Sequence, residues 1–116
     1  MRKNKYSGRS LLPVNNVSEQ QIRLTQAEIS DSSGELPELD LHGKTANQAS
    51  VEVYDYIISM NAAGETCCRI VHGKGTGVLE HVVTNEIEDL AIQGIIETSF
   101  SSHKYPGAAI VVVFHI

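Results

Sequence analysis

Apolar residues change their spacing along this chain, and the changes predict a series of strands and helices. Three short segments after residue 65 combine apolar and β-branched side chains, and residues 39–43 alternate apolar and polar side chains before a glycine, and both patterns are typical of strands. We expect strands over residues 39–43, 66–71, 95–100 and 108–114. Between the first three segments, apolar residues recur every three or four positions, which predicts two amphipathic helices. The predicted order is βαβαββ, an α/β two-layer sandwich with a four-stranded mixed sheet and two helices.

Both predicted helices have end signals in the sequence. Thr45 and Gln48 form a capping-box sequence, in which each side chain accepts a hydrogen bond from the other residue's backbone N–H. Gly64 and Gly94 follow the last apolar positions of the two periodic stretches, and glycine is the preferred residue at such ends. The helices are therefore expected to begin near residues 45 and 78 and to end at these glycines.

The first 37 residues are rich in Ser, Asn, Gln and Glu and show no sustained period. We expect residues 1–37 to form an extended or partly disordered arm before a domain over residues 38–116. A helix over residues 17–29, beginning at Ser18, is the alternative for part of the arm. The first nine residues contain no acid and four cations, which are Arg2, Lys3, Lys5 and Arg9. This run either contacts phosphates or is a solvated tail.

Charge narrows the ways in which the chain can bind a partner. Its 116 residues carry a net charge of −5, and residues 38–116 contain four Lys or Arg against ten Asp or Glu. Proteins that bind nucleic acid along a broad surface need many cations to neutralise the phosphates. The predicted domain must therefore bind any phosphate at a local site, or with help from the arm.

The cysteines and the apolar runs indicate in which cellular compartment the protein is expected. Cys67 and Cys68 are adjacent on a predicted strand and so point to opposite faces, which excludes an unstrained disulfide between them. The sequence shows neither an apolar leader nor an apolar run of about 18 residues. We expect a cytoplasmic protein that does not enter a membrane.

Three of the four cations in the predicted domain follow strands. Strands that are joined through right-handed crossovers run parallel, so the ends of the first three strands lie at one edge of the sheet. Lys44, Lys74 and Lys104 each follow one of these ends, whereas the acids lie mainly on the helices. Ligands of open α/β sheets bind at this edge, so an acidic domain can still present a positive site there.

A loop with three alternating glycines follows the second predicted strand. Gly73, Gly75 and Gly77 permit positive φ angles and leave backbone N–H groups uncovered before the next helix. The positive end of that helix dipole favours anions, so we expect the loop and Lys74 to hold a phosphate. The spacing matches neither G-x-x-x-x-G-K-[ST] nor G-x-G-x-x-G, and a plain strand-to-helix turn is the alternative.

Histidines are expected at the same edge as the lysines. His42 and His72 each precede a glycine at the end of a parallel strand, and Asp40 lies just inside the first strand. One imidazole can deprotonate a nucleophile while another protonates a leaving oxygen, so Asp40, His42 and His72 are the expected catalytic residues on a phosphodiester. The same three residues are the alternative set for a divalent-metal site. His103 is expected near the phosphate, and His81 is expected to be structural or solvated.

Two motifs occur in a fixed order: L-D-L-H-G at residues 39–43 and H-G-K-G-T-G at residues 72–77. With them, residues 38–116 resemble the Smr (small MutS-related) domain family. The resemblance implies an α/β sandwich similar to the C-terminal domain of a bacterial translation initiation factor. It also implies endonuclease activity on DNA or RNA, in roles from recombination control to cleavage of messenger RNA on stalled ribosomes.

By position, Asp40 and His42 match the proposed catalytic pair of the first motif. The phosphate-handling loop of the second motif matches His72, Gly73, Lys74, Gly75 and Gly77. Gln48 stands where the family often has Glu, a change expected to affect only the helix cap. Residues 106–109, Pro-Gly-Ala-Ala, replace a more glycine-rich third motif, which bears on the start of the fourth strand and on one wall of the substrate groove.

The leading hypothesis is a nucleic-acid endonuclease that cleaves DNA or RNA, with the ribosome as a further candidate partner. The expected phosphate-binding residues are Gly73, Lys74, Gly75, Gly77, Lys44, Lys104 and His103. A requirement for a divalent cation, Mg²⁺ or Mn²⁺, is left open, as is the oligomeric state. The alternatives are a module that binds nucleic acid or the ribosome without cutting, and a small-molecule phosphate enzyme that uses the glycine loop.

Overall fold

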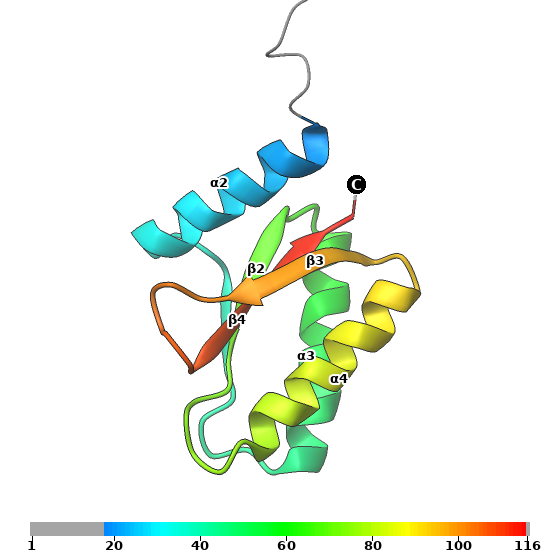
Figure 1. Cartoon of the computed structure of the whole chain (residues 1–116). Coiled ribbons are helices and arrows are strands. Elements are labelled where there is room, and N and C mark those ends of the chain that lie inside the picture. Colours follow the sequence, from blue (N-terminus) through cyan, green and yellow to red (C-terminus); the bar gives the residue numbers. More distant parts are fainter. Residues whose placement is uncertain (1–17, 116) are drawn as a thin grey trace, which may run out of the picture.

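A four-stranded sheet with helices on both faces makes up the part of the chain that the structure describes (Figure 1). The structure is a computed structural model and describes residues 18–115. Its elements are α2 (Glu19–Ser33), β1 (Glu38–Asp40), α3 (Ala46–Ala62), β2 (Cys67–Val71), α4 (Val78–Ile92), β3 (Ile96–Ser101) and β4 (Ala109–Phe114). From residue 38 onward the order is βαβαββ, as the spacing of apolar residues predicts.

The strand order in the sheet is β1-β2-β4-β3. β1 and β2 are parallel, and β4 runs antiparallel to both β2 and β3. β3 therefore points in the same direction as β1 and β2, which confirms the mixed sheet and brings the ends of these three strands to one edge. Val71, the last residue of β2, pairs with Asp40 of β1 and with Ala109 of β4. This register aligns the end of β1 with the start of β4.

α3 and α4 begin and end where their sequence signals lie. The Thr45 hydroxyl accepts a hydrogen bond from the Gln48 backbone N–H at 3.2 Å, and the Gln48 side-chain oxygen accepts one from the Thr45 N–H at 3.0 Å, which confirms the capping box. Gly64 and Gly94 follow the two helices with φ of 81° and 82°. None of the helices described between residues 18 and 115 is long and apolar enough to cross a membrane.

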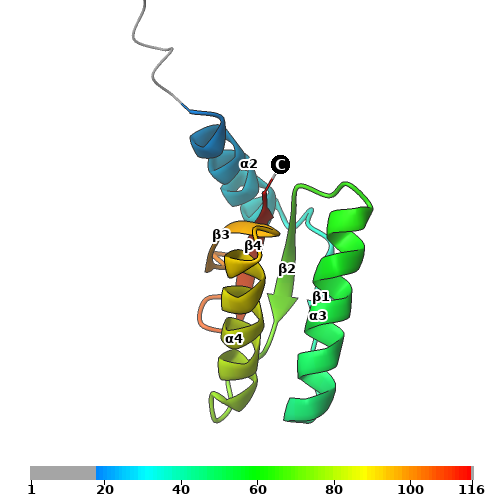
Figure 2. The same ribbon diagram turned by 90° about the vertical axis from the view of Figure 1, so that its right-hand side faces the viewer.

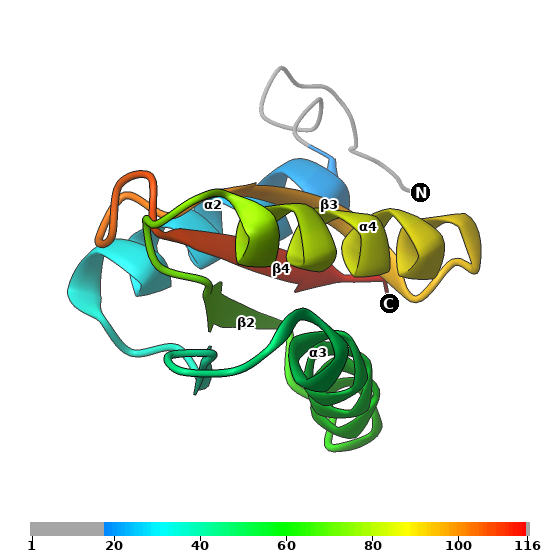
Figure 3. The same ribbon diagram turned by 90° about the horizontal axis from the view of Figure 1, so that it is seen from below.

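α3 and α4 lie side by side on one face of the sheet (Figures 2 and 3). Ser50 of α3 donates a hydrogen bond to a carboxylate oxygen of Glu86 of α4 at 2.7 Å. The buried core on this face consists of Leu41, Ala49, Val53, Ile57, Cys68, Ile70, Val83, Ile87, Leu90, Ile96, Val112 and Phe114. This packing holds the N-termini of both helices at the edge where β1 and β2 end.

The two cysteines lie on opposite faces of β2, as the alternation of strand side chains predicts. Cys68 belongs to the core beneath α3 and α4, whereas Cys67 belongs to a second apolar cluster on the other face. Both are free thiols. Burial raises the pKa of the Cys68 thiol to about 12, so this cysteine is an unreactive part of the core.

α2 covers the face of the sheet opposite α3 and α4 (Figure 1). It begins after Ser18, whose hydroxyl accepts a hydrogen bond from the backbone N–H of Gln21 at 3.1 Å. Ala27 of α2 packs against Val111 and Val113 of β4. Over residues 19–33 the structure thus differs from the expectation of an extended or partly disordered arm and agrees with the alternative of a helix from Ser18.

The periodic signal of α2 is weak because its buried face is small and partly polar. Its buried residues are Ala27 and Asp31, whereas its large apolar residues Ile22 and Ile29 are 44% and 65% exposed. A helix of this kind shows no apolar stripe in the sequence. Residues 1–17, including the four cations of the first nine residues, lie outside the described residues.

A buried ion pair joins the C-terminal end of α2 to the sheet. Asp31 and Arg69 of β2 are 0% and 1% exposed. The Arg69 Nε donates to Asp31 Oδ1 at 2.9 Å, and its other nitrogens donate to the Asp31 carbonyl at 2.9 Å and to Glu38 Oε1 at 2.8 Å. Burial by itself would raise the pKa of Asp31, but hydrogen bonds from Ser102, His103 and Arg69, with the Arg69 charge, hold this pKa below its usual value.

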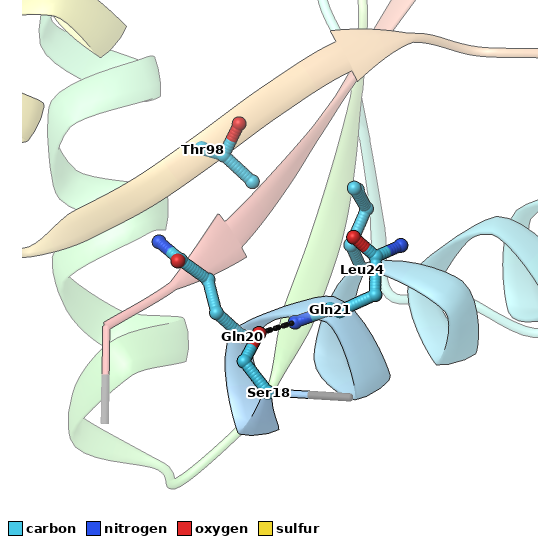
Figure 4. Close-up of a pocket in the computed structure, with 5 residues that line it drawn as sticks. All are labelled: Ser18, Gln20, Gln21, Leu24 and Thr98. Atoms are coloured by element: carbon cyan, nitrogen blue, oxygen red, sulfur yellow. Dashed lines mark hydrogen bonds between the residues drawn. The ribbon is translucent and has the colours of Figure 1, made fainter. Parts of the chain in front are cut away.

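A second polar contact joins the N-terminal end of α2 to β3. The Arg23 guanidinium pairs with the carboxylate of Glu97, whose second oxygen is buried without a hydrogen-bond partner among the described residues. A shallow pocket lies beside this contact, between the first turns of α2 and Thr98 of β3 (Figure 4). α2 is thus fixed to the sheet at both ends, and its deeper attachment is at Asp31.

We predict that Asp31→Asn lowers the free energy of unfolding by about 3 kcal/mol at pH 7, because loss of one partner leaves a buried charge poorly compensated. The pKa of Asp31 is lower in the folded chain than in the unfolded chain. The pair therefore stabilises the folded state fully at pH values above the usual carboxyl pKa of about 4. Its contribution is lost as pH falls through the folded-state pKa. Urea unfolding of both proteins at pH 7 and at pH 3 measures the difference.

The exposed Glu35, which follows the same helix, provides the control for this experiment. Glu35→Gln should leave the free energy of unfolding unchanged at both pH values. An Asp31→Asn penalty of equal size at pH 7 and pH 3 would contradict the linkage.

Candidate functional site

The loop after β1 carries the first motif and is fixed by its own side chains. Leu41 is fully buried in the core, and its backbone N–H donates to the Val71 carbonyl at 2.9 Å. Asp40 and His42 are exposed, as alternation along the strand predicts. The Asp40 carboxylate accepts a hydrogen bond from the backbone N–H of His42 at 2.9 Å. The carboxylate therefore fixes the backbone that carries the imidazole.

The loop after β2 needs its glycines. Gly73, Gly75 and Gly77 adopt φ of 79°, 61° and 89°, a region that other residues enter only with strain. Gly77 occupies the N-cap of α4, and no side chain caps this helix. The first backbone N–H groups of α4 are therefore left for an outside acceptor, at the positive end of the helix dipole.

His72 and His42 lie in different surroundings. His72 is only 7% exposed, and its backbone N–H donates to the Ala108 carbonyl at 2.9 Å. Its Nδ1 lies 2.6 Å from the Gly73 carbonyl oxygen. Because a carbonyl only accepts, this contact assigns the proton to Nδ1 and leaves Nε2 as an acceptor in the neutral ring. His42, by contrast, is open to solvent.

The two loops together form a groove of about 430 Å³ at the edge of the sheet. Its lining consists of Asp40, His42, Gly43, Val71, His72, Gly73, Lys74, Gly75 and Leu79. This edge groove brings together all three residues expected to be catalytic and most of the expected phosphate-binding loop. Gly77 lines an adjoining hollow of about 180 Å³ around the N-terminus of α4, formed by residues 72–80.

Besides Gly77, three predicted phosphate-binding residues do not line the edge groove. Lys44 pairs with Glu52 of α3 at 3.1 Å. Lys104 lies over the Tyr105 ring, with Nζ 5.4 Å from its centre, and reaches toward the backbone at the end of α2. His103 lies against Phe100, which packs on the α2 face of the sheet. Their positions after strands are as predicted, but their side chains turn away from the groove.

The turn between β3 and β4 forms a support for the glycine loop that the sequence analysis missed. The Ala108 carbonyl accepts hydrogen bonds from the backbone N–H groups of both His72 and Gly73, each at 2.9 Å. Gly107 has a φ of 74°, and its Cα faces the aliphatic part of Lys74. The altered third motif at residues 106–109 therefore still shapes the start of β4. The departure from the family pattern was its only signal in the sequence.

The expected donors do not form a metal cage by themselves. Within residues 18–115, no group of three or more His, Cys, Asp or Glu side chains is arranged to hold a metal ion. Asp40 uses one carboxylate oxygen on the His42 backbone, and the His72 Nδ1 faces a carbonyl. A cation at the edge groove would need further ligands from a substrate, as Mg²⁺ sites with phosphates commonly do.

Comparisons with known proteins identify the family of this chain. The Smr domain family model matches residues 39–114. Endonuclease MutS2 of Enterococcus faecalis is 36% identical over 83 residues, which are 72% of this chain and 10% of that protein. Endonuclease MutS2 of Levilactobacillus brevis is 44% identical over 59 residues, which are 51% of this chain and 8% of that protein. The chain thus spans about a tenth of the length of these curated relatives.

A solved structure supports the same relationship. The Smr domain of Thermus thermophilus MutS2 superposes with a TM-score of 0.62 and 28% sequence identity, over 70% of this chain and 100% of that chain. The match to the family model includes both motifs of the edge groove and all four strands except the first residue of β1. Sequence, fold and site therefore lead to one conclusion: the chain belongs to the Smr domain family.

Proposed function

We propose that the chain is an endonuclease that cleaves phosphodiester bonds of DNA or RNA in its edge groove. Its relation to the Smr domains of MutS2 endonucleases supports a nuclease-related or nucleic-acid-binding function. The observation that carries the finer proposal is the groove itself. It combines two histidines and a carboxylate with a glycine loop and the uncapped start of α4.

The glycine loop and α4 hold the scissile phosphate in this proposal. Backbone N–H groups at the start of α4 donate to the phosphate oxygens, and the helix dipole adds a favourable field. Lys74 lines both the edge groove and the adjoining hollow, so its ammonium group can neutralise the same phosphate. Such donors also stabilise the charge that develops on the phosphorus oxygens during cleavage.

The histidines divide the proton transfers between them. Nε2 of His72 carries a lone pair and removes a proton from the attacking water or ribose hydroxyl. The exposed imidazole of His42, in its protonated form, donates a proton to the leaving oxygen. Asp40 keeps the backbone of His42 in place through its hydrogen bond. After cleavage His72 is protonated and His42 is neutral, and proton exchange with solvent then returns each histidine to its starting form.

One observation favours a second candidate function, a module that binds nucleic acid without cutting. The Asp40 carboxylate bonds to the backbone of His42 rather than to its ring, so these two residues do not form a preformed carboxylate–imidazole pair. The helices are also acidic, and three of the five described cations, Arg23, Lys44 and Arg69, are already paired with carboxylates. These features suit weak and local phosphate binding.

A cleavage assay separates the two functions. Single-stranded RNA and supercoiled DNA are incubated with the wild type in EDTA, Mg²⁺ or Mn²⁺, and then with His42→Ala, His72→Gln and Asp40→Asn. We expect each histidine substitution to lower the cleavage rate by at least about 10²-fold, because general acid–base catalysis typically contributes that much.

His81→Ala is the matched control, since His81 is exposed on α4 and does not line the edge groove. It should cleave at the wild-type rate. Cleavage that survives the loss of both His42 and His72 would contradict the catalytic assignment. Tight binding without cleavage of either substrate would favour the binding module.

Lys74 should contribute one phosphate contact, and Lys104 should contribute none. We expect Lys74→Met to weaken binding of a single-stranded oligonucleotide and to reduce the slope of log K against log salt by about 0.7. Fluorescence anisotropy between 50 and 200 mM salt, roughly the range over which such contacts are resolved, gives this slope. Lys104→Met is the control, and an equal change in both variants would contradict the assignment.

The cations of residues 1–17 should supply further phosphate contacts. Removal of residues 2–17 retains α2 and the whole described fold, whereas removal of residues 1–37 would also remove Asp31. We expect the shorter deletion to reduce the salt slope by up to about 3, because it removes Arg2, Lys3, Lys5 and Arg9. Unchanged affinity and slope would indicate a solvated tail.

A further inference from the structure

The turn between β3 and β4, residues 102–108, lies between α2 and the glycine loop. On one side, its first residues contact Asp31 at the end of α2. On the other side, Ala108 contacts the backbone of the glycine loop. The turn is therefore a physical connection between a helix on one face of the sheet and the edge groove.

Asp31 fixes the first half of this turn. Its Oδ1 accepts a hydrogen bond from the Ser102 hydroxyl at 2.8 Å, and its Oδ2 accepts one from the His103 backbone N–H at 2.7 Å. The Ser102 oxygen in turn accepts from the backbone N–H groups of Lys104 and Tyr105, each at 3.1 Å. Ser102 is 2% exposed, so water does not compete for these bonds.

The second half of the turn fixes the glycine loop. The Ala108 N–H donates to the Tyr105 carbonyl at 3.0 Å, which closes the turn next to the glycine loop. That carbonyl accepts from His72 and Gly73. A Cβ at Gly107 would lie 3.7 Å from Cε of Lys74, so the stem of this lysine rests on the turn.

Burial makes this connection stiff. Asp31 would be costly to bury without Arg69, and an apolar contact of the same size would attach α2 to the sheet equally well. Unlike an apolar residue, a carboxylate at this position also fixes the geometry of Ser102 and His103 through hydrogen bonds. The Smr family match begins at residue 39, so Asp31 comes from a segment outside it.

We infer that Asp31 is a positioning residue, which acts through Ser102 and Ala108 to fix the backbone of His72 and Gly73 in the edge groove. α2 then covers one face of the sheet and also fixes the backbone of the edge groove through Asp31. The expected effect on substrate rests on the proposed function, but the expected effect on the backbone does not.

Ser102→Ala is the sharpest test, because it removes the hydroxyl that Asp31 holds and leaves the Asp31–Arg69 pair in place. The primary measurement is amide hydrogen exchange at His72 and Gly73, followed by NMR. We expect exchange at both amides to rise by about tenfold, the effect of weakening one hydrogen-bonded unit. Ser102→Thr keeps the hydroxyl and should restore slow exchange.

Arg23→Gln is the matched control, since it breaks the other polar contact between α2 and the sheet, far along the helix from the turn. It should lower the midpoint of thermal unfolding without changing exchange at His72 and Gly73. Asp31→Asn, studied at a temperature where circular dichroism shows it to be folded, should raise exchange at both amides as Ser102→Ala does.

Equal exchange in Ser102→Ala and the wild type would overturn the inference. So would an equal rise in Arg23→Gln, because the effect would then be general destabilisation. Oligonucleotide affinity, measured in parallel, should fall several-fold in Ser102→Ala and stay unchanged in Arg23→Gln. If the proposed function is wrong, the affinity measurement shows no difference between the variants, while the hydrogen-exchange measurement still tests whether Asp31 positions the glycine loop.

Discussion

The buried ion pair between Asp31 and Arg69 is the constraint on which the rest of the structure depends. Two fully buried charges are tolerated only when each is paired and hydrogen-bonded. Here the partners come from four parts of the chain, since Arg69 also bonds to Glu38 at the start of β1 and Asp31 also bonds to the β3–β4 turn. α2, the two parallel strands and that turn must therefore assemble in one arrangement.

That arrangement determines the chemistry of the edge groove. The parallel ends of β1 and β2 bring two histidines to one place, and the β3–β4 turn fixes the backbone of only one of them. His72 is buried and held in a single tautomer, whereas His42 is exposed on a loop anchored by Asp40. Two similar residues thus have different surroundings, as the proposed roles of base and acid require.

Electrostatics limits how the protein can meet a polyanion. The described residues include all 14 acids of the chain but only five of its nine Lys or Arg. Three of those five cations are already paired with carboxylates, so few remain for phosphates. In the proposed function, binding relies on the glycine loop, Lys74 and the cations before residue 18. A site of this kind favours one well-placed phosphate over a long stretch of backbone.

The sequence by itself determined the four strands, α3, α4, their caps and the residues of the edge groove, because these depend on local spacing, on glycines that permit positive φ and on the shared direction of parallel strands. It did not determine α2, which has no apolar stripe to reveal it. Nor did it determine where Lys44, Lys104 and His103 point, since residues after a strand can turn to either face. Only the tertiary structure decided these features. The attachment of α2, for example, depends on Asp31 and Arg69, which are 38 positions apart and leave no local pattern in the sequence.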